Sequence, residues 1–411
     1  MDRFSHCTLA AALRRVVSAT LASLVIYVAA TSALNAPVTA GTLDADGPTP
    51  VTLGEKIFAD ASLSASGAMS CATCHDPKFA HAQSNDLPAQ RGGAGLDVPG
   101  FRVVPSLQYI SMTPPFTIAA DGTPSGGFDR DGRAQDLLVQ AQRPLFAPHE
   151  MANATPGDLV ARLARTPYAD EFRKVFGQNI FDDAQATVLG VTFALARYQL
   201  LDPDFRPFNS KYDLFLAGKL RLEPAELRGL ALFNRADKGN CAACHPSGRG
   251  PGNAPPMFTD FTYDNLGVPR NPRIDANLDP TYRDLGLCGP ERTDLADHPE
   301  FCGAFKVPTL RNVATRKVFF HNAQFNALHD ALRFYVRRDT NPEEFYPIDA
   351  DGTVQKFDDL PADLRGNVNT EEVPYDRLRG ESPTLSDAEL DDLEIFLNTL
   401  TDGYQPVGAT H

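Results

Sequence analysis

A five-residue pattern that occurs twice constrains this chain more than any other feature. Residues 71–75 read Cys-Ala-Thr-Cys-His, and residues 241–245 read Cys-Ala-Ala-Cys-His. In such a segment both thiols can form thioethers to a haem, and the adjacent histidine becomes the proximal iron ligand. A zinc knuckle or a redox Cys-x-x-Cys pair needs no histidine directly after the second cysteine. The sequence therefore predicts two covalently bound haem c groups, with His75 and His245 as iron ligands and thioethers from Cys71, Cys74, Cys241 and Cys244.

The first 40 residues have the pattern of a secretory signal peptide. Three arginines precede an apolar run over residues 16–30, and small residues follow around Ala33 and Ala40. A membrane-spanning helix needs about 20 apolar residues, and this run is shorter. We therefore expect cleavage after Ala33 or Ala40, a periplasmic location and no stable membrane span afterwards, with an uncleaved anchor as the alternative.

Cysteine usage fits an oxidising compartment. Of the seven cysteines, four belong to the repeated motif and Cys7 lies in the signal segment, which leaves Cys288 and Cys302. A disulfide between them is permitted in the periplasm, and closing so short a loop would contribute about 3 kcal/mol in the chain-entropy model. Two reduced thiols are the alternative.

The chain without its signal segment is strongly acidic. Removing residues 1–40 leaves 35 basic and 51 acidic side chains, a net charge of −16. Such a balance argues against nucleic-acid binding. It suits a basic electron-transfer partner, although an acidic surface can also serve solubility alone.

The chain contains an internal duplication around the two motifs. The helix-forming segments Leu53–Phe58 and Leu227–Phe233 precede the first and second motifs. The segments Val104–Leu107 and Val307–Leu310 follow them, and each begins with Val-Pro. We place the boundary between the two units near residues 216–221, so the signal peptide covers 1–40 and the haem units cover 41–215 and 216–411.

Periodicity predicts helices rather than strands. Residues 182–201 and 387–400 show apolar residues at helical spacing, whereas residues 91–127 and 246–299 are rich in Gly and Pro and read as long irregular loops. No stretch alternates apolar and polar residues over a useful length. The expected fold is mainly α, with two cytochrome c-like haem domains and long irregular loops.

A further set of motifs resembles the bacterial di-haem cytochrome c peroxidase and MauG superfamily. Residues 128–134 (Phe-Asp-Arg-Asp-Gly-Arg-Ala), Gln140 and residues 148–151 (Pro-His-Glu-Met) are similar to the family segment FFWDGRA…Q…P-x-E-M. Residues 306–313 and 331–335 of the second half also match. The resemblance covers nearly the whole mature chain.

The resemblance implies that Glu150 and Gln140 lie on the distal side of the first haem. Cleavage of peroxide needs a base that takes a proton from one oxygen and returns it to the other, and an apolar pocket raises the proton affinity of a carboxylate. Gln140 would orient the peroxide, and Pro144 would shape the pocket. Without the resemblance, Glu150 fits a salt bridge in a loop. Gln140 then fits a solvent-facing position on a helix.

The resemblance also implies different sixth ligands for the two haems. The removable histidine ligand of some family members corresponds to Gly95, so we expect an open first haem and a surface or loop position for His81. At the second haem the family's methionine is replaced by Tyr335, as in the MauG branch. A phenolate would favour oxidised iron. Met257 is the competing ligand, and Tyr335 as a core aromatic is the plain alternative.

Other positions depart from the family. His321 is expected to contact a haem propionate or a residue that itself contacts the haem. The family's inter-haem tryptophan corresponds to Arg130, and the chain has no tryptophan. Three positions of the family's calcium site are Val103, Arg316 and Val318, which leaves only backbone carbonyls as oxygen donors for a cation there.

Together these features predict a periplasmic di-haem peroxidase-like oxidoreductase. It would reduce hydrogen peroxide through high-valent haem, with electrons from a small cytochrome c or a copper protein. Two alternatives remain: a MauG-like peroxide-dependent oxidase that modifies a protein substrate, and a non-enzymatic di-haem electron carrier in which both irons have six ligands.

Overall fold

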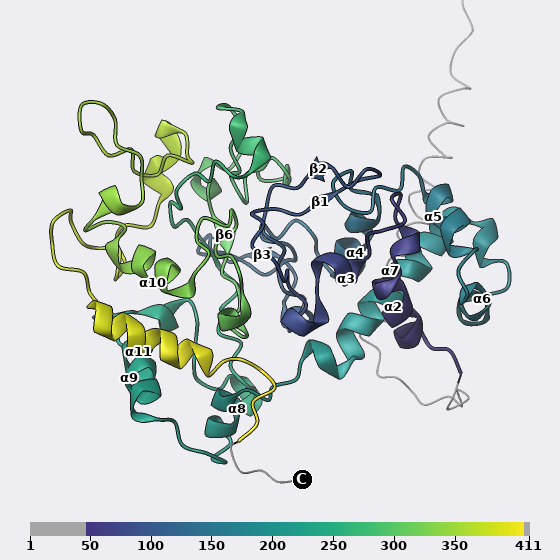
Figure 1. The fold of residues 1–411 in the computed structure, drawn as a ribbon, viewed down its shortest axis with the longest axis horizontal. Helices are drawn as coiled ribbons and strands as arrows, with labels where there is room; N and C mark the ends of the chain where they lie inside the picture. The colour runs from purple at the N-terminus through teal and green to yellow at the C-terminus, as the bar shows by residue number, and fades with distance from the viewer. Residues whose placement is uncertain (1–46, 407–411) are drawn as a thin grey trace, which may run out of the picture.

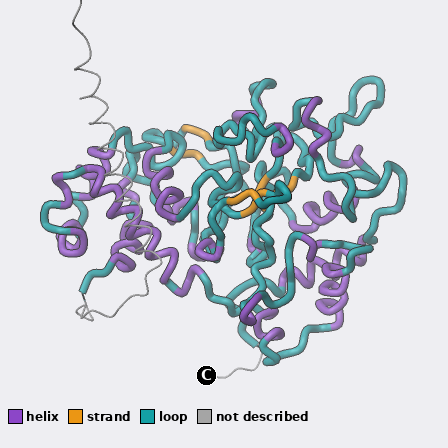
Figure 2. Tube along the Cα trace, turned by 180° about the vertical axis from the view of Figure 1, so that it is seen from behind, coloured by secondary structure: helices purple, strands orange, loops and turns teal. Residues whose placement is uncertain are grey.

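Helices gather at the two ends of the molecule, and irregular chain fills the middle (Figures 1 and 2). The computed structural model describes residues 47–406. One end holds α2 (Pro50–Ala59), α3 (Cys71–Cys74), α4 (Leu137–Phe146), α5 (Pro156–Leu163), α6 (Ala169–Phe176) and α7 (Ala184–Leu201). The other end holds α8 (Lys211–Leu216), α9 (Pro224–Asn234), α10 (Leu328–Arg337) and α11 (Asp387–Asn398). The expectation of a mainly α fold is confirmed.

The strands are short ladders inside the irregular part. Each ladder pairs two residues with two, antiparallel, and none extends into a larger sheet among residues 47–406. The pairs are β1 (Arg91–Gly92) with β2 (Val98–Pro99), β3 (Thr117–Ile118) with β4 (Pro124–Ser125), and β5 (Tyr263–Asp264) with β6 (Phe305–Lys306). In the last pair Tyr263 lies opposite Lys306, which ties the long 246–299 loop to the chain that follows it.

Helix starts follow from local capping chemistry. The Thr49 hydroxyl accepts from the Thr52 amide at 3.2 Å to begin α2, and proline occupies the first helical position. Ser386 and Glu389 form a capping box at the start of α11. The helices expected at 53–58 and 227–233 are confirmed as parts of α2 and α9. Those expected from periodicity at 182–201 and 387–400 are confirmed as α7 and α11, each two residues shorter than expected.

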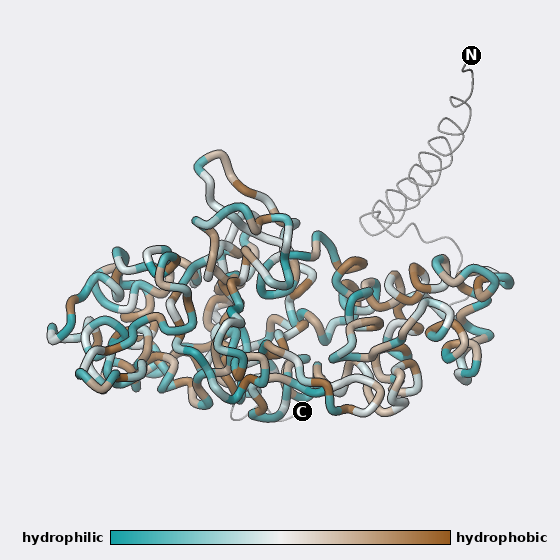
Figure 3. The backbone as a smooth tube through the Cα atoms, turned by 90° about the horizontal axis from the view of Figure 1, so that it is seen from above, coloured by the Kyte–Doolittle hydropathy of each residue, from teal (hydrophilic) through white to brown (hydrophobic). Residues whose placement is uncertain are grey.

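Two separate hydrophobic cores accompany the duplication. The first packs α2, α5 and α7 together around residues such as Ile57 and Val191. The second packs α9 and α11 together around Phe233 and Phe396. Tyr212 of α8 belongs to the second core, so we propose that the C-terminal unit begins ahead of α8, a few residues before the expected boundary. Figure 3, seen from above, shows this division along the long axis.

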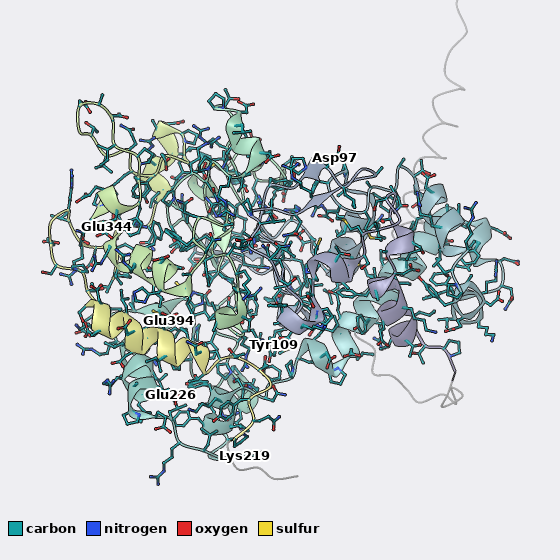
Figure 4. All side chains as sticks on the ribbon, viewed as in Figure 1. Asp97, Tyr109, Lys219, Glu226, Glu344 and Glu394 are labelled. Atoms are coloured by element: carbon teal, nitrogen blue, oxygen red, sulfur yellow. A yellow bond between two sulfur atoms is a disulfide. The ribbon has the colours of Figure 1, made fainter. Side chains whose placement is uncertain are left out.

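Buried polar contacts join the two halves. The Tyr109 hydroxyl, labelled between the halves in Figure 4, donates to Asp402 Oδ2 at 2.7 Å, and Asn312 Nδ2 donates to the same oxygen at 2.7 Å. Arg102 donates to both oxygens of Asp284 at 2.6 Å. Charge-assisted, bidentate bonds of this kind are strong and directional, so they fix how the halves face one another.

No helix within residues 47–406 has the length and apolar character needed to cross a bilayer. The expected signal peptide, residues 1–40, lies outside the described part of the chain.

In each half, two helices cross at a glycine. A Cβ atom on Gly54 of α2 would lie 2.1 Å from the Ala194 carbonyl oxygen of α7. A Cβ atom on Gly229 of α9 would lie 2.0 Å from the Asp392 carbonyl oxygen of α11. Both glycines precede a buried phenylalanine by four residues. The duplicated unit is thus a glycine-mediated helix crossing next to each Cys-x-x-Cys-His motif.

The substitution Gly229→Ala should destabilise the protein by about 1–3 kcal/mol, because the new methyl group overpacks the crossing. Intrinsic helix propensity alone would favour alanine by about 1 kcal/mol. Gly157→Ala on α5 is the control, since its Cβ would meet nothing closer than 3.6 Å. Denaturant unfolding compares the two, and an unchanged or higher stability for Gly229→Ala would contradict the close crossing.

Candidate functional site

The two Cys-x-x-Cys-His segments hold their histidines in the same way. The His75 amide donates to the Cys71 carbonyl at 2.8 Å, and the His245 amide donates to the Cys241 carbonyl at 2.8 Å. His75 Nδ1 lies 3.2 Å from the carbonyl oxygen of His81. His245 Nδ1 lies 2.8 Å from the carbonyl oxygen of Phe258. A carbonyl oxygen accepts only, so Nδ1 carries the proton in both rings and Nε2 keeps a free lone pair.

The surroundings of both rings favour the neutral imidazole that binds iron. Burial lowers the pKa of His75 to about 4 and also lowers the pKa of His245. The carbonyls of Pro105 and Pro308 raise the pKa of His75 and His245, respectively, and so offset part of the effect of burial. These prolines belong to the two Val-Pro segments, so the duplication extends to the groups around each histidine.

His81 is not the surface residue expected from the sequence. Its side chain is only 1% exposed and stacks on Phe205 with ring centroids 4.1 Å apart. Of the two expected positions, the loop is confirmed, since His81 follows the turn at Pro77–Phe79, and the surface is wrong, because the aromatic cover comes from a segment more than a hundred residues away. Both ring nitrogens lack a hydrogen-bond partner among the described residues. What His81 contributes to the site is its carbonyl oxygen, which orients His75.

The four motif cysteines are unpaired and suited to a thioether. They form no disulfide, and burial raises the pKa of each thiol to about 12. These thiols are therefore kept uncharged. A thioether sulfur also carries no charge, so this environment fits covalent haem attachment.

A cavity of about 340 Å³ connects the second motif to the space between the halves. Its wall includes Cys241, Cys244, His245, Tyr335, Gln140 and Pro105. An apolar cavity that begins at a proximal histidine and two thiols fits a haem. The cavity also reaches the Val-Pro segment beside His75. One cavity therefore adjoins both His245 and the residues next to His75.

Two arginines in this cavity wall have no acidic partner. Arg130 donates from Nε to the Val103 carbonyl at 3.0 Å, and neither Arg130 nor Arg316 forms an ion pair within residues 47–406. Burial lowers the pKa of Arg130 to about 9 and that of Arg316 to about 10. Buried charges need counter-charges. Haem propionates would supply them, so the two guanidinium groups fit the cofactor.

His321 lies in the same wall. Its ring stacks on Phe305 with centroids 3.7 Å apart, and its Nε2 has no hydrogen-bond partner in the described chain. Burial lowers the pKa of His321 to about 3, so the ring is neutral. A neutral ring next to Arg130 fits the expected propionate contact, which stays a prediction.

Glu150 lies close to the first motif. Its charge acts on both Cys71 and Cys74, which places the carboxylate on the side of the first haem site. The Gly93 amide donates to the Glu150 carbonyl at 2.9 Å and fixes the backbone. Burial raises the pKa of Glu150 to about 7, with Asp129 adding to the effect and Arg143 opposing it. A carboxyl group with this pKa can both take and release a proton near neutral pH.

Gln140 and Pro144 lie on α4. Gln140 is 9% exposed and lines the cavity, so the solvent-facing alternative is wrong for it. Pro144 lies inside the helix, where it cannot donate to the carbonyl of Gln140 four residues earlier. The helix ends at Phe146, and the chain turns toward Glu150. No hydrogen bond joins the Gln140 and Glu150 side chains, so their joint action on peroxide stays a prediction.

Tyr335 and Met257 both line the cavity with His245. Tyr335 lies on α10, half-buried, with Phe320 and Tyr375 at centroid distances of 5.6 and 6.2 Å. Met257 directly precedes Phe258, whose carbonyl oxygen holds His245. The Met257 carbonyl accepts from the Thr309 hydroxyl at 2.6 Å. Tyr335 as the iron ligand, with Met257 as its competitor, stays a prediction.

The calcium position of the family is apolar in this chain. Val103 and Val318 pack with Ala323 in a small buried cluster. Within residues 47–406 no group of three or more His, Cys, Asp or Glu side chains is arranged to hold a metal ion. Binding of calcium through backbone carbonyls remains untested.

A disulfide closes a loop that reaches across to the first haem site. Cys288 and Cys302 are bonded, with Cα atoms 4.9 Å apart, so the alternative of reduced thiols is wrong in this structure. Asp284, four residues before this loop, binds Arg102, and the loop itself carries Glu291, whose Oε2 lies 3.3 Å from Arg143. Sequence reasoning missed the role of Glu291, because it acts through a contact with the distant Arg143. It also missed that Arg316 lines the cavity, because the wall is built from segments far apart in the sequence.

Two equivalent histidine-and-thiol units, an arginine-lined cavity and a carboxyl group beside one unit define a protein with two haem-binding units. Comparison with known proteins gives the same class. Residues 48–221 match the family model described as di-haem cytochrome c peroxidase.

Similar proteins cover most of the chain. It is 34% identical to the methylamine utilization protein MauG of Paracoccus denitrificans over 374 residues, which is 86% of this chain and 89% of that protein. It is 28% identical to cytochrome c551 peroxidase of Nitrosomonas europaea, over 72% of this chain and 76% of that one. The diheme peroxidase BthA from Burkholderia thailandensis superposes with a TM-score of 0.79 and 37% identity, covering 90% of this chain and 89% of that chain.

The chain therefore belongs to the family of di-haem cytochrome c peroxidases and MauG proteins, and the resemblance seen in the sequence is confirmed. Membership in this family implies two haem groups and an oxidoreductase function.

The substitution Arg316→Gln should lower the thermal midpoint of the haem-containing protein, because it removes a cation that we expect to neutralise a propionate. Loss of one partner of a buried charge pair costs about 3–5 kcal/mol. Lys219→Gln is the control, since this side chain is exposed and does not line the cavity. An equal midpoint for both variants would show that Arg316 does not contact the cofactor.

Proposed function

We propose that this protein is a periplasmic, peroxide-dependent di-haem oxidoreductase whose haems are attached through Cys71, Cys74, Cys241 and Cys244. Family membership supports the cofactors, and the uncharged thiols beside each proximal histidine support covalent attachment. Haem iron, when bound at His75 and His245, would supply the redox chemistry. The remaining steps belong to side chains of this chain.

Glu150 is the base and acid for peroxide cleavage. Its carboxylate accepts the proton of the peroxide oxygen that approaches the iron, and the resulting carboxylic acid returns that proton to the departing oxygen. The single observation that carries this role is a carboxyl group with a pKa of about 7 beside the first motif. The Gln140 amide has both a donor and an acceptor, so it can hold the peroxide in place.

The first haem keeps an open face for peroxide in this proposal. Gly95, in the turn between β1 and β2, has no side chain that could bind iron. The His81 ring is held between Phe205 and Phe58, and its backbone is used by His75. The carrier alternative would require another protein ligand on this iron, and resting EPR without a high-spin ferric signal would favour it.

Tyr335 closes the second haem. An anionic phenolate oxygen stabilises oxidised iron, so this haem would store oxidising equivalents. Burial raises the pKa of Tyr335, with Cys241 and Asp264 adding to the effect, and the positive charge of Arg338 opposes it only in part. The ionised phenol therefore depends on the iron as its counter-charge.

Two reactions fit this arrangement. The acidic surface and the similarity to cytochrome c551 peroxidase favour reduction of peroxide with electrons from a basic cytochrome or a copper protein. The similarity to MauG over most of the chain, together with Tyr335, favours oxidation of a protein side chain as the second candidate. Rapid turnover with a small donor protein supports the first, and its absence supports the second.

The reaction with peroxide should depend on pH through Glu150. The base must be ionised, and its pKa is raised to about 7, so the rate should fall about tenfold per pH unit below 7 and level off above it. Glu150→Gln should lose the spectral response to peroxide at every pH while both haems stay attached. Stopped-flow absorbance measures both, and an unchanged response would remove Glu150 from the reaction.

The substitution Tyr335→Phe should change the resting EPR signal of the second haem, because it removes the oxygen ligand. Tyr375→Phe is the matched control, since this tyrosine packs beside Tyr335 without a proposed bond to iron. The first haem serves as an internal reference in both spectra. Identical spectra for wild type and Tyr335→Phe would exclude the ligand role.

A further inference from the structure

Tyr109 and Asn312, which the proposed reaction does not use, occupy equivalent positions in the two units. Each lies four residues after the proline of its Val-Pro segment. Both have a left-handed backbone, with φ of 63° and 59°. Asparagine tolerates this conformation, whereas for a bulky tyrosine it is unusual. The surrounding structure therefore imposes the conformation of Tyr109.

A single carboxylate holds both residues. The Tyr109 hydroxyl donates to Asp402 Oδ2 at 2.7 Å, and Asn312 Nδ2 donates to the same oxygen at 2.7 Å. The Asn209 amide donates to Asp402 Oδ1 at 3.2 Å. In Figure 4 the labelled tyrosine lies between the two halves. Asp402 therefore joins the ends of the two Val-Pro segments.

A short path thus connects the surroundings of the two proximal histidines. At the start of the first segment, the Pro105 carbonyl acts on the His75 ring, and the Pro308 carbonyl acts on the His245 ring in the same way. From each proline the covalent backbone leads to the hydrogen bonds at Asp402. Electrons pass more readily along covalent and hydrogen-bonded contacts than across empty space. The path therefore favours electron exchange between the two sites.

Tyr109 is the side chain on this path that can be oxidised. The chain has no tryptophan, which leaves tyrosine as its most readily oxidised aromatic residue. Within residues 47–406, the tyrosines that line the cavity are Tyr109, Tyr335 and Tyr375. Tyr335 is the proposed iron ligand. Among these three described side chains, the Tyr109 hydroxyl alone donates to a carboxylate.

The surroundings of Tyr109 require that its proton leave together with an electron. The guanidinium carbon of Arg311, which Asp213 binds, lies 4.9 Å from the Tyr109 ring centroid and disfavours positive charge on the ring. Burial raises the pKa of Tyr109, with Asp402 adding to the effect, so the resting phenol keeps its proton. A phenol that has lost an electron is a strong acid, and Asp402 is in place to accept the proton.

Asp402 is a better base than a free aspartate. Burial raises its pKa, and the hydrogen bonds from Tyr109 and Asn312 oppose this effect only in part. The carboxylate therefore has both the position and the proton affinity that oxidation of the phenol requires.

We propose that Tyr109 is the redox relay between the two haem sites. The inference rests on the proposed function, in which reaction with peroxide leaves an oxidised haem at the first site. Tyr109 gives one electron to that oxidised haem, its O–H bond breaks, and the proton goes to Asp402 Oδ2. The phenoxyl radical then takes one electron from the haem at the second site, and the proton returns from Asp402.

Two substitutions and one control test the relay. Tyr109→Phe keeps the ring beside Phe208 and removes the oxidisable phenol. Asp402→Asn keeps a hydrogen-bond acceptor and removes the base. Tyr168→Phe is the matched control, because the Tyr168 hydroxyl donates to Asp60 Oδ2 at 2.6 Å in the first core, outside the cavity wall. All variants are compared at equal haem content and with the resting haem spectra as a check on folding.

Stopped-flow absorbance after mixing with equimolar hydrogen peroxide reports how fast the second haem is oxidised. The rate should fall about tenfold or more in Tyr109→Phe and Asp402→Asn, and stay unchanged in Tyr168→Phe. Wild-type oxidation should also be slower in heavy water, because the hydroxyl proton moves with the electron. This isotope effect should disappear in Tyr109→Phe. A purely structural role for Tyr109 would leave the isotope effect in place.

Freeze-quench EPR provides a readout other than rate. A radical signal that narrows when the protein carries ring-deuterated tyrosine is expected in the wild type and in Tyr168→Phe. The same signal should be absent in Tyr109→Phe. A slower oxidation of the second haem together with loss of the isotope effect supports the relay even where the radical is too short-lived to be trapped.

The outcomes separate the relay from the proposed function. If Tyr109→Phe matches the wild type in rate, isotope effect and EPR spectrum while the first haem responds to peroxide in both proteins, electrons pass between the sites without Tyr109 and the relay is wrong. If peroxide oxidises neither haem of the wild type, the proposed function fails, and the relay fails with it.

Discussion

The hydrogen bond from each proximal histidine to a backbone carbonyl is the constraint on which the two sites depend. In both units the accepting residue, His81 or Phe258, has a left-handed backbone, with φ of 51° and 53°. That conformation turns the carbonyl toward Nδ1 and leaves Nε2 as the only lone pair for iron. The thiols, the Val-Pro segment and the glycine-mediated helix crossing are all arranged around this bond. The duplicated element is therefore the proximal half of a haem site.

The two units differ in the residues proposed to act on the haem face opposite the proximal histidine. The first unit presents Glu150, a carboxyl group that can exchange a proton near neutral pH, and the second presents Tyr335, a phenol oxygen on α10. Arg130 and Arg316 lie between the units without acidic partners. Their charge would stabilise anionic groups on both cofactors at once, so the two redox centres would share one electrostatic environment.

The sequence was sufficient for features that depend on local pattern. Motif spacing identified the histidines and thiols, helical periodicity identified α2, α7, α9 and α11, and the family resemblance was confirmed. Features formed between distant segments could not be predicted. His81 is buried by Phe205, 124 residues away in the chain, and Glu291 reaches Arg143 across the interface between the halves. Neither contact leaves a periodic or compositional signal near the residues concerned.

The loop closed by Cys288 and Cys302 and the segment just before it belong to the C-terminal half. Nevertheless Asp284 of that segment binds Arg102, and Glu291 of the loop binds Arg143, and both arginines lie in the N-terminal half. Each copy of the duplicated unit therefore depends on contacts with the other copy. Without the C-terminal half, the N-terminal half would lack Asp284 and Glu291, which bind its Arg102 and Arg143. A substitution at one of these contacts therefore affects both halves. An isolated N-terminal fragment would be incomplete rather than a smaller version of the protein.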